Sequence, residues 1–236
     1  MTFKKHIPNI ITCCNLIAGC FACISALTGY LDNAFYLIMA GAIFDFFDGM
    51  AARLLKVSSP IGKELDSLAD VVTFGVAPSM MLFYTLSVIE KPNGFYPIMG
   101  YTPHLAFVMA AFSALRLAKF NLDTRQTTSF IGLPTPANAL FWGALIVGKD
   151  IDLNTSPNTF FLLLALLAFA CWILVAEIPM FALKFKQWGW KGNEVRYSFI
   201  LSCIPILAFF QLFGLAIIIA WYIVLSVVLH LRHQSQ

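Results

Sequence analysis

Four aspartates, Asp45, Asp48, Asp66 and Asp70, stand close together in a strongly apolar part of the chain. Asp45 and Asp48 are three residues apart and Asp66 and Asp70 are four apart, so each pair shares one face of a helix. A carboxylate near hydrocarbon costs about 2.5 to 3.5 kcal/mol on insertion scales, so a group of them needs a compensating ligand. Because no His or Cys stands beside them, the oxygen ligands favour a hard divalent cation, Mg²⁺ or Mn²⁺.

The residues between the two pairs supply the other parts of a phosphate site. Gly49, Ala52 and Gly62 are small enough for a ligand to approach the backbone closely. The guanidinium of Arg53 can bind a phosphate through two parallel hydrogen bonds. Carboxylates, a metal ion, small residues and one arginine together predict a site for a phosphate ester.

The elements that carry these residues must lie in a membrane. The chain has 236 residues, of which 60% are hydrophobic and 11% charged, and soluble domains average about 25% charged. We expect an all-α, polytopic helix bundle, because several apolar stretches approach the roughly 20 residues that span a bilayer. These stretches are residues 7–28, 34–55, 71–89, 102–120, 132–149, 158–183, 196–211 and 213–231. Gln211 and Gly214 favour a turn between the last two, whereas Pro205 could instead mark a kink in one longer helix.

The basic residues predict the orientation of the bundle, because cytoplasmic loops are rich in Lys and Arg. With the N-terminus inside, only Lys91 and Lys149 fall outside. The inner residues are Lys4, Lys5, Arg53, Lys56, Lys63, Arg116, Lys119, Arg125, Lys184, Lys186, Lys191, Arg196 and Arg232. We therefore expect both termini and the aspartates on the cytoplasmic side. The modest net charge of +3 fits anionic lipid headgroups and argues against nucleic acid as a partner.

The aspartates and small residues form a motif, D-x2-D-G-x2-A-R-x8-G-x3-D-x3-D, in which the chain resembles the CDP-alcohol phosphatidyltransferases. The matching residues are Asp45, Asp48, Gly49, Ala52, Arg53, Gly62, Asp66 and Asp70. Residues 7–19, 64–79, 116–121 and 132–139 resemble the serine-using branch of this family. Relatives that use glycerol phosphate tend instead to carry a LDPLADK-like form of the block at 64–79, where residues 65–71 of this chain read LDSLADV. The resemblance covers roughly residues 7–139 and implies one membrane-embedded domain over 1–236, with a six-helix core at about 7–183 and extra helices at about 196–231.

The resemblance implies transfer of a phosphatidyl group from CDP-diacylglycerol to L-serine with release of CMP. Two ions of Mg²⁺ or Mn²⁺ would be held by Asp45, Asp48 and Asp66, with Asp70 also close to the metal and acting as the general base. The CDP moiety would be held by Gly49, Ala52, Arg53 and Gly62, together with Asn9 and Thr12 of the first helix. The relatives form homodimers, and the expected location is a bacterial cytoplasmic membrane.

Several polar residues have two interpretations. Arg116 and Asn121 could bind the serine carboxylate and headgroup, or the basic chains could extend to the interface without a function. Asn9 and Thr12 share their helix face with Asn15, which could equally be a hydrogen-bonded seam between helices. Glu177 could pair with nearby lysines at the interface or contact the serine ammonium.

Two other functions stay open. The same chemistry could use inositol phosphate, glycerol phosphate or an ether-linked archaeal lipid donor, although a phosphorylated acceptor should require more basic residues around its pocket. An ion-coupled transporter could also place carboxylates inside a membrane. A transporter predicts flux across sealed vesicles without release of CMP.

Overall fold

The computed structural model describes residues 4, 6–57, 59–89, 100–123, 130–148, 157–181, 189–190 and 193–234. In this part of the chain six helices are long and apolar enough to cross a membrane, and one further apolar helix is shorter. The expected all-α polytopic bundle is confirmed. Of the basic residues used to predict the orientation, Lys5, Lys91, Arg125, Lys149, Lys184, Lys186 and Lys191 lie outside the described residues.

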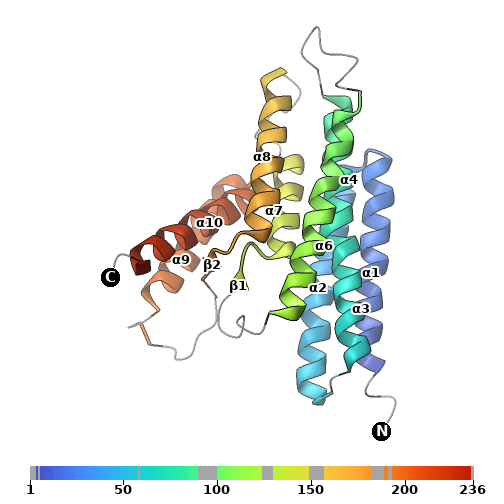
Figure 1. The fold of residues 1–236 in the computed structure, drawn as a ribbon, viewed down its shortest axis with the longest axis vertical. Coiled ribbons are helices and arrows are strands. Elements are labelled where there is room, and N and C mark those ends of the chain that lie inside the picture. Colours follow the sequence, from blue (N-terminus) through green and yellow to red (C-terminus); the bar gives the residue numbers. More distant parts are fainter. Residues whose placement is uncertain are drawn as a thin grey trace.

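Each predicted stretch contains a helix. The helices are α1 (His6–Leu27), α2 (Leu31–Leu55), α3 (Pro60–Asp70), η2 (Val71–Val76), α4 (Ala77–Val88), η3 (Thr102–Leu105), α6 (Ala106–Leu122), α7 (Thr135–Val147), α8 (Pro157–Val175), α9 (Glu194–Phe210) and α10 (Phe213–Gln234). Helices α1, α2, α4 and α6 run side by side along the long axis, and α9 and α10 lie obliquely to one side (Figure 1). Gln211, at φ 49°, ends α9, so the turn predicted there is confirmed and Pro205 lies inside a helix.

The third membrane helix begins earlier than the predicted residue 71. Helices α3, η2 and α4 form one continuous helix, Pro60–Val88. The side chain of Ser59 accepts a hydrogen bond from the Gly62 N–H at 2.9 Å, and Pro60 occupies the first turn, where its missing N–H costs nothing. This early start places Asp66 and Asp70 inside the membrane helix, on the shared helix face that their spacing predicted.

A π-helical turn, η2, follows Asp70 directly. The Ala77 N–H bonds to the carbonyl of Val72, five residues back, and the next residue, Pro78, has no N–H to donate to a carbonyl of the preceding turn. The Thr73 hydroxyl donates to the backbone carbonyl of Asn15 in α1 at 3.0 Å. The widened turn therefore joins α1 to the helix that carries two of the aspartates, and π-turns are frequent at functional sites.

The close approach of α1 to η2 depends on Gly19. A Cβ placed at Gly19 would lie 2.9 Å from Thr73 Cα, which is backbone that cannot rotate away. We expect Gly19→Ala to lower the free energy of unfolding by about 1 to 3 kcal/mol through overpacking. Thermal unfolding in detergent measures this, with Gly49→Ala as the control, because no atom lies within 4 Å of a Cβ at Gly49. Equal melting temperatures for the two variants would contradict the prediction.

A short antiparallel ribbon, absent from the sequence-based expectation, joins the segments that flank α7 and α8. Strand β1 (Phe130–Ile131) pairs with β2 (Pro179–Met180). Helix α8 ends at Val175, before β2, so the predicted helix over residues 158–183 was too long. Gly132, at φ 74°, donates its N–H to the Ile178 carbonyl at 3.0 Å. The ribbon therefore fixes the chain that leaves α8 beside the segment that enters α7.

Candidate metal and phosphate site

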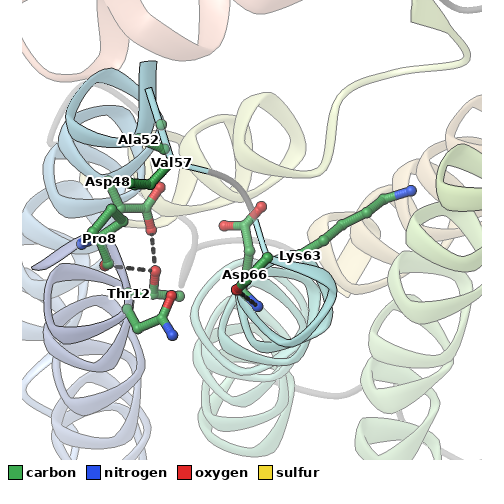
Figure 2. Close-up of a pocket in the computed structure, with 11 residues that line it drawn as sticks. Pro8, Thr12, Asp48, Ala52, Val57, Lys63 and Asp66 are labelled. Carbon is green, nitrogen blue, oxygen red and sulfur yellow. Dashed lines mark hydrogen bonds between the residues drawn. The ribbon is translucent and has the colours of Figure 1, made fainter. Parts of the chain in front are cut away.

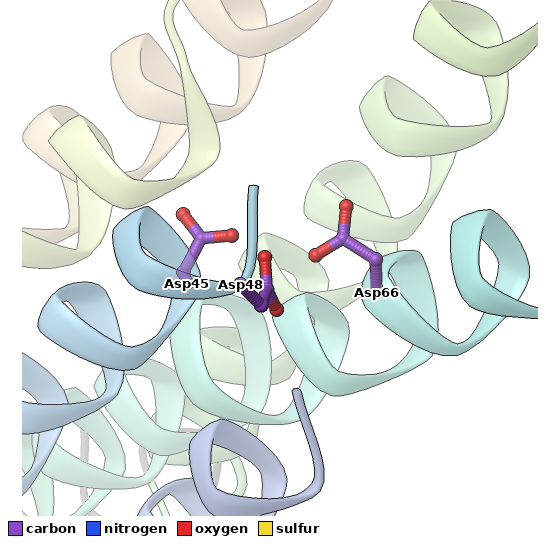
Figure 3. A group of neighbouring side chains, drawn as sticks. All are labelled: Asp45, Asp48 and Asp66. Atoms are coloured by element: carbon purple, nitrogen blue, oxygen red, sulfur yellow. The ribbon is translucent and has the colours of Figure 1, made fainter. Parts of the chain in front are cut away.

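Three of the four aspartates meet at one point. Asp45 and Asp48 project from α2 and Asp66 from α3, and each offers a carboxylate oxygen within 4.8 Å of the other two (Figure 3). Asp48 is only 6% exposed. Oδ1 of Asp66 is buried and has no hydrogen-bond partner in the described part of the chain. Because three carboxylates this close repel one another and one oxygen is unsatisfied, the residues fit a hard divalent cation.

Asp70 is held separately, by α1. Its Oδ1 accepts a hydrogen bond from Asn15 Nδ2 at 3.1 Å, and both residues are buried, with 8% and 0% of their surfaces exposed. Asp70 does not belong to the group of three carboxylates that meet within 4.8 Å, although it interacts electrostatically with Asp45 and Asp66. Its predicted roles, as a further ligand and as the base, stay predictions.

Thr12 holds Asp48 from the same face of α1. Its hydroxyl lies 2.6 Å from Asp48 Oδ2 and 3.0 Å from the carbonyl oxygen of Pro8. Thr12 and Asn15 therefore form the hydrogen-bonded seam between helices that was one of the two interpretations from the sequence. Its partners are the carboxylates of Asp48 and Asp70. Helix α1 orients two of the four aspartates.

Removing this support should weaken metal binding. We expect Thr12→Val, which keeps the shape but not the hydroxyl, to lower Mn²⁺ affinity about 10- to 100-fold, the usual cost of losing a group that orients a ligand. Titration of the purified protein followed by Mn²⁺ electron paramagnetic resonance measures this. The control is Thr28→Val, directly after the other end of α1, where the hydroxyl bonds only to backbone carbonyls of the preceding helical turn. Unchanged Mn²⁺ affinity in Thr12→Val would show that Asp48 needs no support.

Beside the carboxylates lies a cavity of about 250 Å³ (Figure 2). It is lined by Pro8, Asn9, Thr12, Asp48, Gly49, Ala52, Val57, Ser59, Gly62, Lys63 and Asp66. Five of the six residues expected to hold CDP meet here, and Asp48 and Asp66 face each other across the opening (Figure 2). The sixth, Arg53, does not line the cavity. Its side chain is exposed, and its Nε donates to the Gly49 carbonyl at 3.1 Å.

Two polar residues of the cavity were not among the predicted site residues, Ser59 and Lys63. Lys63 stands three residues before Asp66 and shares its helix face, which is a signal that the sequence did contain. Its Nζ donates to the backbone carbonyl of Asn121 at 3.0 Å. A cavity with a carboxylate on either side and glycine backbone in its wall can accept a metal-bound phosphate ester.

Arg116 and Asn121, predicted to bind the acceptor, do not line this cavity. Asn121 Nδ2 donates to Ser67 Oγ at 2.8 Å and so links α6 to α3. Arg116 is 6% exposed, so its side chain packs inside the bundle and does not extend from the protein surface. Its Nη1 lies 3.5 Å from Thr135 Oγ1 and its guanidinium 5.1 Å from the ring centre of Phe120.

Comparison with known proteins places this arrangement in one family. The family model described as CDP-alcohol phosphatidyltransferase matches residues 5–188, beyond the last sequence block that carried the resemblance. A protein of Bacillus subtilis (strain 168) named CDP-diacylglycerol–serine O-phosphatidyltransferase is 42% identical over 136 residues, 56% of this chain and 70% of that protein. A protein of the same name from Helicobacter pylori (strain ATCC 700392 / 26695) is 31% identical over 186 residues, 78% of this chain and 75% of that protein. Another of the same name, from Methanocaldococcus jannaschii, is 33% identical over 196 residues, 75% of this chain and 87% of that protein.

Proposed function

Because this chain belongs to the CDP-alcohol phosphatidyltransferase family, we propose that it transfers the phosphatidyl group of CDP-diacylglycerol to L-serine, forming phosphatidylserine and CMP. The observation that carries the proposal is the meeting of Asp45, Asp48 and Asp66. Two of these carboxylates, Asp48 and Asp66, line a cavity together with Gly49 and Gly62. The printed names of the relatives support serine as the acceptor.

The three carboxylates would hold Mg²⁺ or Mn²⁺, with Asp70 as a further ligand if a second ion binds. The bound cations would neutralise the pyrophosphate of the donor. Gly49, Ala52 and Gly62 leave room for the CDP moiety against the backbone of α2 and α3. Lys63 also lines the cavity, but its ammonium points away from the carboxylates and bonds to the Asn121 carbonyl (Figure 2). Asn9, Thr12 and Arg53 complete the proposed donor site.

Asp70 would act as the general base. The hydrogen bond from Asn15 occupies its Oδ1, which leaves Oδ2 to accept the proton of the serine hydroxyl. The serine oxygen then bonds to the phosphorus that carries diacylglycerol while the bond from this phosphorus to the CMP oxygen breaks. This is a direct displacement, without a covalent intermediate on the chain.

The proposed setting is a membrane whose cytoplasmic face meets the aspartates. Described basic residues at this end of the bundle, among them Lys63 and Lys119, support that orientation. A homodimer in a bacterial cytoplasmic membrane is carried over from the family resemblance alone.

The test is CMP release by the purified protein in detergent with CDP-diacylglycerol and Mn²⁺ or Mg²⁺. We expect release with L-serine and not with inositol phosphate or glycerol phosphate, and we expect a chelator to abolish it until the metal is restored. Release with another alcohol would keep the chemistry and overturn the acceptor. No release with any alcohol would favour the transporter, which ion flux across sealed vesicles would then test.

A further inference from the structure

A second, smaller cavity lies at the C-terminal end of α6, beside the ribbon formed by β1 and β2. It is lined by Arg116, Lys119, Asp123, Ile131, Leu174, Val175 and Glu177. The cavity has a volume of about 40 Å³. One water molecule needs about 10 to 15 Å³ of such a cavity. The cavity can hold about three groups of this size, and its walls carry charges of both signs.

Arg116, which lines this cavity, has hydrogen-bond donors without a partner in the described part of the chain. Its Nε and Nη2 are buried and have no hydrogen-bond partner among the described residues, and its one polar contact, to Thr135, is long at 3.5 Å. A buried guanidinium with free N–H groups is costly unless an anion binds it, and a carboxylate matches its paired donors. Arg116 also interacts electrostatically with Asp70, the proposed base.

Glu177 supplies the opposite charge. It lies between the end of α8 and β2, next to Ile178, whose carbonyl accepts the Gly132 N–H at 3.0 Å. The ribbon thus fixes the backbone that carries this carboxylate. No residue of the described part of the chain forms an ion pair or hydrogen bond with the Glu177 side chain, whereas Asp123 does interact with another residue.

We propose that this cavity binds the amino-acid end of the acceptor, with Arg116 taking the α-carboxylate and Glu177 the α-ammonium. The inference rests on the proposed function and deepens it, because it assigns the selection of a zwitterionic alcohol to two named side chains. Inositol phosphate and glycerol phosphate lack an ammonium and carry more negative charge, so Glu177 repels them. Glu177 is then a specificity residue that rejects phosphorylated acceptors as well as one that attracts serine.

The test compares L-serine with 3-hydroxypropanoate, which is serine without its amino group. We expect Glu177→Gln to raise the KM for serine about 10- to 100-fold, the usual loss for a hydrogen bond to a charged group. The kcat for serine should change little, and kcat/KM for 3-hydroxypropanoate should not fall. Wild-type preference for serine over 3-hydroxypropanoate should therefore collapse in the variant, and Glu177→Asp should restore part of it. Glu64→Gln is the control, because Glu64 is an exposed acid of α3 that lines neither cavity.

The outcomes separate the two proposals. If the wild-type protein releases no CMP with serine, the proposed function fails and this assignment fails with it. If the wild type uses serine and Glu177→Gln keeps the wild-type KM, only this assignment is overturned. An equal rise in KM for both acceptors would show a structural role for Glu177 and would also overturn it.

Discussion

Asp66→Asn is expected to reduce CMP release about a thousandfold or more, equivalent to about 4 kcal/mol of transition-state stabilisation. Asp66 is the carboxylate of the three that comes from α3, opposite the two from α2. Its Oδ1 is buried with no hydrogen-bond partner in the described residues, so it is free to bind a cation. An amide keeps the shape of the side chain and removes the charge, so Mn²⁺ affinity should fall together with activity.

Two measurements on one preparation decide this prediction. CMP release gives the rate, and Mn²⁺ electron paramagnetic resonance gives the affinity for the ion. Glu64→Gln is the matched control, since it removes one carboxylate charge from the same helix at an exposed position. Loss of activity with unchanged Mn²⁺ binding would rule out Asp66 as a metal ligand and would assign it another role.

Asp70→Asn is expected to lower kcat about 10²- to 10⁴-fold, which is the usual contribution of a general base. Asp70 stands outside the group of three carboxylates that meet within 4.8 Å. Its replacement should therefore weaken Mn²⁺ binding less than Asp66→Asn does. The side chain would still be able to bond with Asn15, so the packing of α1 against α3 should be retained.

The same rate and binding measurements test Asp70, with one control changed. Asp32→Asn alters the same residue type in the first turn of α2, at the end of that helix opposite Asp45 and Asp48. We expect it to leave both activity and Mn²⁺ affinity as in the wild type. If Asp70→Asn loses Mn²⁺ as completely as Asp66→Asn, Asp70 is primarily a ligand and another group must accept the proton.

The sequence alone determined the features that depend on local spacing. Residues three or four apart share a helix face whatever surrounds them, so the pairing of Asp45 with Asp48 and the place of Gly49 and Ala52 beside them were predictable. Hydropathy was sufficient for the order of the apolar helices, because a bilayer admits few alternatives to an apolar helix. It predicted eight spans, whereas six helices of the described residues are long and apolar enough to cross a membrane and one further apolar helix is shorter. The motif then pointed to the family that residues 5–188 match.

Only the tertiary structure decided which distant residues meet. The contact of Thr12 with Asp48 spans 36 positions and that of Asn15 with Asp70 spans 55, and no local pattern encodes such separations. The two-residue strands are too short for an alternating pattern to be read, yet they hold Glu177 beside the cavity of Arg116. Helix packing also separated Arg53 from the cavity and brought Lys63 into it. Spacing specifies a helix face, but the neighbour of that face is set by how the whole bundle packs.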